Sequence, residues 1–166
     1  MSDIRIRHAE PRDRQAIASL LDVAFGQPDE ARLVEALVAG GHGVLDLVAE
    51  VDGVLAGHVL FSRLTVEGEG GAFPALALAP VAVLPAMQNR GIGSHLIEEG
   101  HAQLERSGEA LSIVLGEPSH YSSFGYSRAR AASFESDYQG EYLQALAWRE
   151  APATGRLVYA PPFTAL

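Results

Sequence analysis

Leu76–Arg106 decides the fold of this chain and reads LALAPVAVLPAMQNRGIGSHLIEEGHAQLER. Its first part, which ends at Val83, is almost wholly apolar and predicts a buried strand. Pro80 removes one ladder hydrogen bond within that strand, so we expect a bulge or splay there that leaves one neighbour unpaired. From Ile92 onward apolar residues recur at helical spacing, and Gly108 is the expected end of the helix. The stretch therefore predicts a strand, a tight loop and an amphipathic helix.

The loop between this strand and helix, Gln88–Ser94, has the features of an anion site. The first turn of a helix leaves backbone N–H groups unsatisfied and carries about half a positive charge, so an acid or a capping side chain usually lies there. No acid opens this helix. Gly91 and Gly93 allow the backbone to approach a large anion closely, and Arg90 adds positive charge. We therefore expect a phosphate or pyrophosphate at the loop, with a plain glycine turn as the alternative.

Two familiar phosphate motifs do not fit this loop. A P-loop carries Lys and then Ser or Thr directly after its last glycine, and this loop does not. A dinucleotide fingerprint needs a third glycine at the position of Leu96. Both kinds of nucleotide site are therefore excluded.

The rest of the chain predicts strands and helices arranged around the central stretch. The expected helices span residues 11–26 and 29–40, and the expected strands span residues 4–7, 45–51, 54–66, 110–115, 131–135, 142–148 and 156–159. Phe25 and Val38 belong to the apolar stripes of the two helices. Asp52-Gly53 predicts a two-residue hairpin turn, and a strand, helix, strand order predicts parallel pairing. The expected fold class is α/β of the α+β kind, a mixed sheet with helices on its faces.

Composition limits the kinds of function that the chain can have. The 166 residues are 48% hydrophobic and 20% charged, and we expect one domain over residues 1–166. A net charge of −9 disfavours nucleic-acid partners and suits a cationic or amine substrate. The absence of cysteine excludes disulfides, thiolate metal sites and a cysteine nucleophile. With no signal-peptide core and no apolar run long enough to span a bilayer, we expect a cytoplasmic protein without membrane contact.

The pattern Gln-x-x-Gly-x-Gly, behind a Val-x-Pro strand end, resembles the acetyl-CoA motif of the GNAT superfamily of N-acetyltransferases. The segments Val114–Pro118 (VLGEP) and Tyr121–Tyr126 (YSSFGY) resemble the later strand and the Tyr-x-x-x-Gly-aromatic helix of that family. Gly155–Phe163 (GRLVYAPPF) resembles the tail of a bacterial subgroup of small members. The match covers nearly the whole chain and is strongest from residue 76 to residue 126. It implies the GNAT acyl-CoA N-acyltransferase fold, with a central mixed β-sheet flanked by helices.

The resemblance also implies acetyl-CoA as co-substrate and a set of residues that hold it. These residues lie at the strand end, in the loop and at the later helix: Val81, Ala82, Val83, Gln88, Asn89, Arg90, Gly91, Ile92, Gly93, Ser94 and Tyr121. In such a fold the first two helices form one wall of the acceptor site. No motif there, or in the C-terminal segment, names the acceptor.

Direct acetyl transfer needs an unprotonated amine, a stabilised oxyanion and a proton for the departing thiolate. For the oxyanion, the resemblance implies free backbone N–H groups of the splayed strand near Ala82 and Val83. For the proton, Tyr121 matches the tyrosine that many GNAT members place beside the sulfur, the alternative being a tyrosine that only caps the pocket. Ser123 stands where the subgroup often has a basic residue.

The general base is less defined by the sequence. Glu117 and His120 flank the end of the strand that should splay from the central one, and Glu50 and His58 lie on the hairpin. Glu117 also suits a simple turn residue, and a chain of waters could remove the proton of the amine.

A metal site and a hydrolase are both disfavoured. His95 and His101 are six residues apart on a helix, which places them on different faces, so no metal is expected. No Gly-x-Ser-x-Gly elbow exists to expose a serine nucleophile near Ser119-His120.

These observations predict an N-acetyltransferase that transfers the acetyl group of acetyl-CoA to a primary amine of a small molecule or a protein. Attack is expected to be direct, within a ternary complex. The alternative from another class is a catalytically silent acyl-CoA-binding or sensor module, and acetylation of tRNA is disfavoured by the acidic charge. The sequence leaves the oligomeric state open, with a homodimer among the expected partners.

Overall fold

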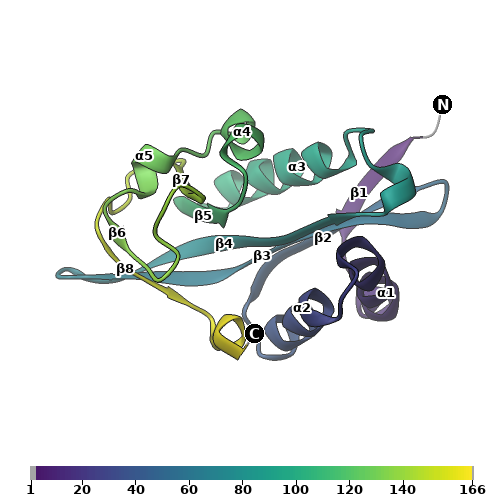
Figure 1. Cartoon of the computed structure of the whole chain (residues 1–166), viewed down its shortest axis with the longest axis horizontal. Coiled ribbons are helices and arrows are strands. Elements are labelled where there is room, and N and C mark those ends of the chain that lie inside the picture. The colour runs from purple at the N-terminus through teal and green to yellow at the C-terminus, as the bar shows by residue number, and fades with distance from the viewer. Residues whose placement is uncertain (1–2, 166) are drawn as a thin grey trace.

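A mixed sheet of eight strands forms the centre of the structure, a computed structural model that describes residues 3–165 (Figure 1). The strands are β1 (Ile4–His8), β2 (Gly43–Val51), β3 (Val54–Gly68), β4 (Gly71–Val83), β5 (Leu111–Leu115), β6 (Phe134–Glu135), β7 (Leu143–Ala147) and β8 (Gly155–Tyr159). The helices are α1 (Arg14–Phe25), α2 (Asp29–Ala39), α3 (Ile92–Arg106), α4 (Pro118–Tyr121) and α5 (Arg128–Ala131). Short 3₁₀ turns lie at Pro11–Asp13, Pro85–Met87, Ser122–Phe124 and Pro161–Ala165.

The strand order is β1-β2-β3-β4-β5-β7, and β8 pairs with both β3 and β6. The pairs β4–β5 and β6–β8 are parallel and the others are antiparallel, which confirms the expected mixed sheet. At the β2–β3 hairpin Val51 pairs with Val54, and Asp52 and Gly53 have positive φ angles of 52° and 78°. This two-residue turn is the one that Asp52-Gly53 predicts.

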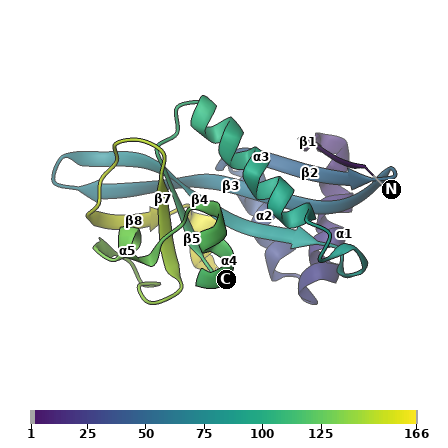
Figure 2. The same ribbon diagram turned by 90° about the horizontal axis from the view of Figure 1, so that it is seen from above.

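Helices cover both faces of the sheet. α1 and α2 lie against one face and α3 lies against the other, as two perpendicular views show (Figures 1 and 2). On the α1–α2 face, Leu21 and Leu37 pack with Leu60 of β3. Phe25 and Val38 were expected to face this core but are 40% and 37% exposed. They belong to the last turn of each helix, and they border two different surface cavities.

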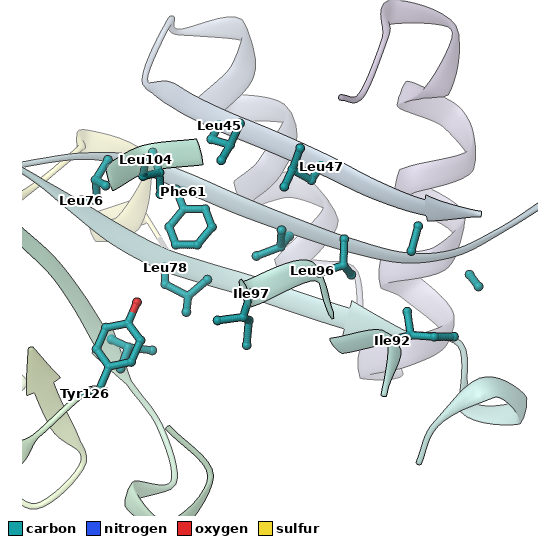
Figure 3. Packing of buried hydrophobic residues seen from close by; sticks show 14 of the residues in the cluster. Leu45, Leu47, Phe61, Leu76, Leu78, Ile92, Leu96, Ile97, Leu104 and Tyr126 are labelled. Atoms are coloured by element: carbon teal, nitrogen blue, oxygen red, sulfur yellow. The ribbon is translucent and has the colours of Figure 1, made fainter. Parts of the chain in front are cut away.

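α3 buries the apolar face that its periodicity predicts. Ile92, Leu96, Ile97 and Leu104 pack on the sheet around Phe61 (Figure 3). Gly100 faces Phe61 so closely that a β-carbon at that position would lie 2.6 Å from Cε1 of the ring. The glycine therefore lets the helix approach the sheet, which fixes where the N-terminus of α3 lies relative to the end of β4.

β4 departs from regular pairing where Pro80 predicts it. Val81 pairs with Val59 of β3 while Leu78 pairs with Phe61, so Ala79-Pro80 forms a β-bulge. On its other side β4 pairs with β5 only from Leu76 to Leu78, and it then continues alone to Val83. The predicted bulge and splay are both confirmed. Beyond Leu78 the two strands separate, and one edge of β4 is open.

The C-terminal part contains less strand than the sequence predicts. Of residues 131–135 only Phe134 and Glu135 form a strand, β6, because Ala131 ends α5 and residues 132–133 form a turn. The first turn of α5 is capped by a hydrogen bond from Arg130 N–H to Ser127 Oγ at 3.0 Å. β8 pairs with Leu64–Glu67, a part of β3 beyond the residues that pair with β2. The final 3₁₀ turn consequently lies beside α2 (Figure 1).

Candidate active site

The loop before α3 has the local features that the sequence leads us to expect of an anion site. Gln88 lies just after a 3₁₀ turn, and its side-chain amide donates to the backbone oxygen of Val83 at 3.3 Å, which ties the loop to the end of β4. Gly91 precedes α3 with a φ of 82°; no side chain caps the helix and its first turn holds no acid. Arg90 is exposed, and no carboxylate pairs with it among residues 3–165. These are the features that favour phosphate.

The two glycines of the loop meet different requirements. A glycine is required at position 91 because the backbone there has a positive φ, which other residues rarely adopt. Gly93 is not required by internal packing, since a β-carbon there would meet only Cγ2 of Val83 at 3.7 Å, an ordinary contact. Its missing side chain leaves the first turn of α3 uncovered. Ile92, between them, turns its side chain into the core and can offer a ligand only its backbone.

The open edge of β4 presents backbone N–H groups to the space between β4 and β5. Leu84 N–H donates to the oxygen of Ala56 on β3 at 2.9 Å. Because N–H groups alternate in direction along a strand, Ala82 N–H also faces β3, whereas those of Val81 and Val83 face the open edge. The N–H groups directed at the open edge are therefore those of Val81 and Val83, whereas the sequence leads us to expect them near Ala82 and Val83.

Next to this edge lies a cavity of about 450 Å³. Its walls come from β4, β5, the α1–α2 pair, α4 and the C-terminal segment. The lining residues are Phe25, Glu30, Leu33, Ala77, Leu78, Ala79, Pro80, Val81, Ile113, Leu115, Tyr121, Tyr138, Tyr159 and Phe163. The first two helices thus form one wall, as the family resemblance implies.

Tyr121 ends α4, the short helix that follows β5, and it lines the cavity. Its ring fills the space above Gly116, where a β-carbon would collide with Cε2 of the ring. The ring also makes an edge-on contact with Tyr126, at 6.0 Å between the ring centroids and 90° between the ring planes. Burial raises the pKa of its hydroxyl, so the group keeps its proton at neutral pH.

The base candidates from the sequence do not line the cavity. Glu117 is exposed at the start of α4, where its backbone oxygen accepts hydrogen bonds from the N–H groups of His120 and Tyr121. Glu50 accepts a 2.6 Å hydrogen bond from Nε of Arg7.

The two histidine candidates, His120 and His58, also lie outside the cavity and contact other residues of the fold. His120 is exposed and its ring packs on Tyr121 and Phe124. His58 is fully buried, with Nε2 2.7 Å from Oδ1 of Asp46. In the described part of the chain no group of three or more His, Asp or Glu side chains is arranged to hold a metal ion.

The structure places one carboxylate in the cavity that the sequence does not single out. Glu30 lies in the first turn of α2, is half-buried, and accepts hydrogen bonds from the side-chain amide of Gln27 at 3.1 and 3.2 Å. An acid at the start of a helix is ordinary, so its position in the sequence gives no signal of a site. Tyr138, Tyr159 and Phe163 were not predicted either, because only tertiary packing brings them to the cavity.

Comparison with known proteins identifies the family. A family model described as an acetyltransferase (GNAT) domain matches residues 5–129. The chain belongs to the GNAT acetyltransferase family. The Gln88–Ser94 loop, β4 and the Tyr121 segment of this GNAT protein all lie within the matched residues.

Relatives with high coverage support this assignment. The uncharacterized N-acetyltransferase YhbS of Escherichia coli K12 is 37% identical over 125 residues, which are 75% of this chain and 74% of YhbS. The crystal structure of E. coli YhbS in complex with CoA has a TM-score of 0.90 and 30% identity, covering 99% of this chain and 93% of that chain. A GNAT family acetyltransferase from Brucella melitensis, crystallised with acetyl-CoA, has a TM-score of 0.83 and 33% identity, covering 97% of this chain and 98% of that chain.

The two solved structures confirm the GNAT fold and the expected kinship with small bacterial members. Their ligands, CoA and acetyl-CoA, are of the kind that the sequence resemblance implies. Among the described residues, no helix is long and apolar enough to cross a membrane.

Proposed function

We propose that this protein is an N-acetyltransferase that transfers the acetyl group of acetyl-CoA directly to a primary amine. The observation that carries the proposal is the splay of β4 from β5 beyond Leu78, which opens onto the cavity that Val81 and Tyr121 line. The backbone N–H groups of the open edge of β4, the Tyr121 hydroxyl as proton donor and a cavity for the acceptor are thus close together. The proposal treats residues 1–166 as one GNAT domain, of which residues 1, 2 and 166 lie outside the described part.

Acetyl-CoA is proposed to bind across the start of α3 and along the open edge of β4. The pyrophosphate would accept hydrogen bonds from the backbone around Gly91 and Gly93, with Arg90 nearby. The pantetheine chain would follow the backbone of Val81 and Val83 into the splay. The proposed contacts are Val81, Val83, Gln88, Asn89, Arg90, Gly91, Ile92, Gly93, Ser94 and Tyr121. That two solved relatives were crystallised with acetyl-CoA and with CoA supports a ligand of this kind.

In the proposed reaction the neutral amine attacks the thioester carbon, a C–N bond forms and the C–S bond breaks. The N–H groups at Val81 and Val83 would stabilise the oxyanion, a kind of contact whose loss typically costs about a hundredfold or more in rate. Tyr121 would donate its proton to the departing thiolate. Because burial raises the pKa of Tyr121, the acid is in its protonated form across the neutral and mildly alkaline range. The proton of the amine leaves through water.

The absence of cysteine supports direct attack. An acetyl-enzyme route would need a serine or another weak nucleophile with an adjacent base to activate it. Near Tyr121, the hydroxyl of Ser123 donates to the backbone oxygen of His120 at 2.6 Å, and that of Ser122 to Ser119 at 3.4 Å. Neither hydroxyl donates to a base.

The alternative function, a silent acyl-CoA-binding or sensor module, accounts for the anion loop but has no need of Tyr121 or an open acceptor cavity. The two are separated by incubating the protein with acetyl-CoA and a panel of primary amines, and measuring released CoA thiol together with acetylated amine. The enzyme predicts equal amounts of both products with at least one amine. The silent module predicts CoA binding with neither product.

A further inference from the structure

Three aromatic rings form a continuous wall in the cavity. Tyr159 lies between Tyr138, at 5.4 Å and 86° between the rings, and Phe163, at 5.4 Å and 63°. They come from β8, from the loop after β6 and from the final 3₁₀ turn. Tyr159 is fixed by the pairing of β8 with Leu64 of β3. The wall is therefore anchored to the sheet.

The same cavity has a negative side chain and no positive one. Glu30 lines it, whereas its other lining residues, all in the described part of the chain, include no Lys, Arg or His. Within the described residues no Lys, Arg or His forms an ion pair with Glu30, which accepts its hydrogen bonds from the neutral amide of Gln27. A half-buried carboxylate without a positive partner favours a cation from outside.

From this juxtaposition we propose that the acceptor is an aliphatic diamine or a longer polyamine. One ammonium group of the acceptor binds between Glu30 and the Tyr138–Tyr159–Phe163 wall, and the other amine, as the free base, reacts at the splay. This inference rests on the proposed function and adds the substrate class. Aromatic faces attract ammonium groups, and a carboxylate beside them supplies the counter-charge.

The two ends of the proposed acceptor need different surroundings, and the cavity provides them. The amine that attacks must be neutral, and the β4 wall, with Leu78, Pro80 and Val81, is apolar and disfavours a charge. The second amine stays charged and needs a partner, which Glu30 provides on another wall. A monoamine can occupy only one of these two environments. If its amine lies at the thioester, it lacks the ionic contact with Glu30, and if its amine binds Glu30, nothing is left to attack the thioester.

The test compares diaminoalkanes with monoamines of matching chain length as acceptors. We expect kcat/KM of the best diamine to exceed that of its monoamine by about tenfold or more, the factor that one cation contact of this kind contributes. Glu30→Gln should remove this preference mainly by raising KM for the diamine, with kcat little changed. Asp29→Asn is the matched control, because Asp29 lies in the same first turn but is exposed and does not line the cavity.

Binding of the diamine to the CoA-loaded protein, measured by equilibrium dialysis, gives a second readout that needs no catalysis. Wild type and Asp29→Asn should bind the diamine, and Glu30→Gln should bind it about tenfold more weakly. Acetyl transfer with equal preference for monoamines, or a Glu30→Gln variant that loses kcat for all amines, would overturn the inference and leave the proposed function intact. Diamine binding that depends on Glu30, without transfer to any amine, would instead reject the proposed function.

Discussion

The ring of Tyr121 occupies the space in which a side chain at Gly116 would lie. Gly116 comes just before the turn into α4, so a change there acts on the ring without altering its hydroxyl. We expect Gly116→Ala to displace the ring and lower kcat by about tenfold or more, because a misplaced acid transfers its proton poorly. CoA affinity, measured by calorimetry, should change little.

The control for this variant is Gly70→Ala, at a position where nothing lies within 4 Å of the added β-carbon. In a Tyr121→Phe background, Gly116→Ala should have little further effect on kcat, since the two changes act on one group. Additive losses would show that Gly116 acts in some other way.

Tyr121→Phe keeps the ring contacts with Tyr126 and removes only the hydroxyl. If Tyr121 protonates the departing thiolate, kcat should fall by roughly 10²-fold, while the affinity for acetyl-CoA stays close to that of wild type. Steady-state kinetics with the best amine of the panel measure both quantities. If Tyr121→Phe keeps the wild-type kcat, the departing thiolate must receive its proton from another group.

Gly93→Val should block CoA binding in a protein that remains folded. The added β-carbon meets only Val83, so the fold tolerates it, but the side chain covers the first turn of α3 where the phosphates are proposed to bind. We expect at least a tenfold loss of CoA affinity by calorimetry, at an unchanged melting temperature. Gly68→Val, with nothing within 4 Å, is the control, and undiminished affinity in Gly93→Val would contradict the site.

Gly91→Val should differ from Gly93→Val by also destabilising the fold. Gly91 has a φ of 82°, which a β-branched residue adopts only with strain of about 1–3 kcal/mol. Urea unfolding of the two variants should therefore separate them, with only Gly91→Val losing stability. Equal stabilities would mean that the backbone at position 91 can relax.

His101 should make the fold sensitive to acid. Its Nε2 lies 3.0 Å from the Tyr126 hydroxyl, and burial lowers its pKa from 6.5 to about 4. Between these values the unfolded chain binds a proton that the folded chain does not, so stability is lost as the pH falls from about 6.5 to 4. The loss amounts to about 3 kcal/mol at most.

Urea unfolding at pH 7 and near pH 4.5 measures this dependence. His101→Gln should show a smaller difference between the two pH values than wild type does. His95→Gln, on the exposed side of the same helix, should retain the wild-type difference. If both variants respond to pH like wild type, another group is responsible.

What the sequence predicts well is the part of the site that is local along the chain. The Pro80 bulge, the acid-free start of α3 and the Tyr121 segment each depend on neighbours within one turn or one strand, and the structure has all three elements. Glu30 and Tyr159 could not be predicted, because their place in the cavity depends on how α2 and β8 meet across the sheet. The expected strand at residues 131–135 is only partly present, because Ala131 belongs to the Ser127-capped α5 and a turn at residues 132–133 precedes the two residues of β6.

Single-turnover analysis tests the central claim, direct acetyl transfer to an amine within one complex, most directly. The protein is first mixed with one equivalent of acetyl-CoA and then with the best amine of the panel, and intact protein mass, CoA thiol and acetylated amine are followed in time. We predict an unmodified protein mass throughout, no CoA release before the amine is added, and simultaneous appearance of CoA and acetylated amine afterwards. A protein that gains one acetyl group from acetyl-CoA alone and passes it to the amine, or the absence of acetylated amine with every acceptor, would contradict the account.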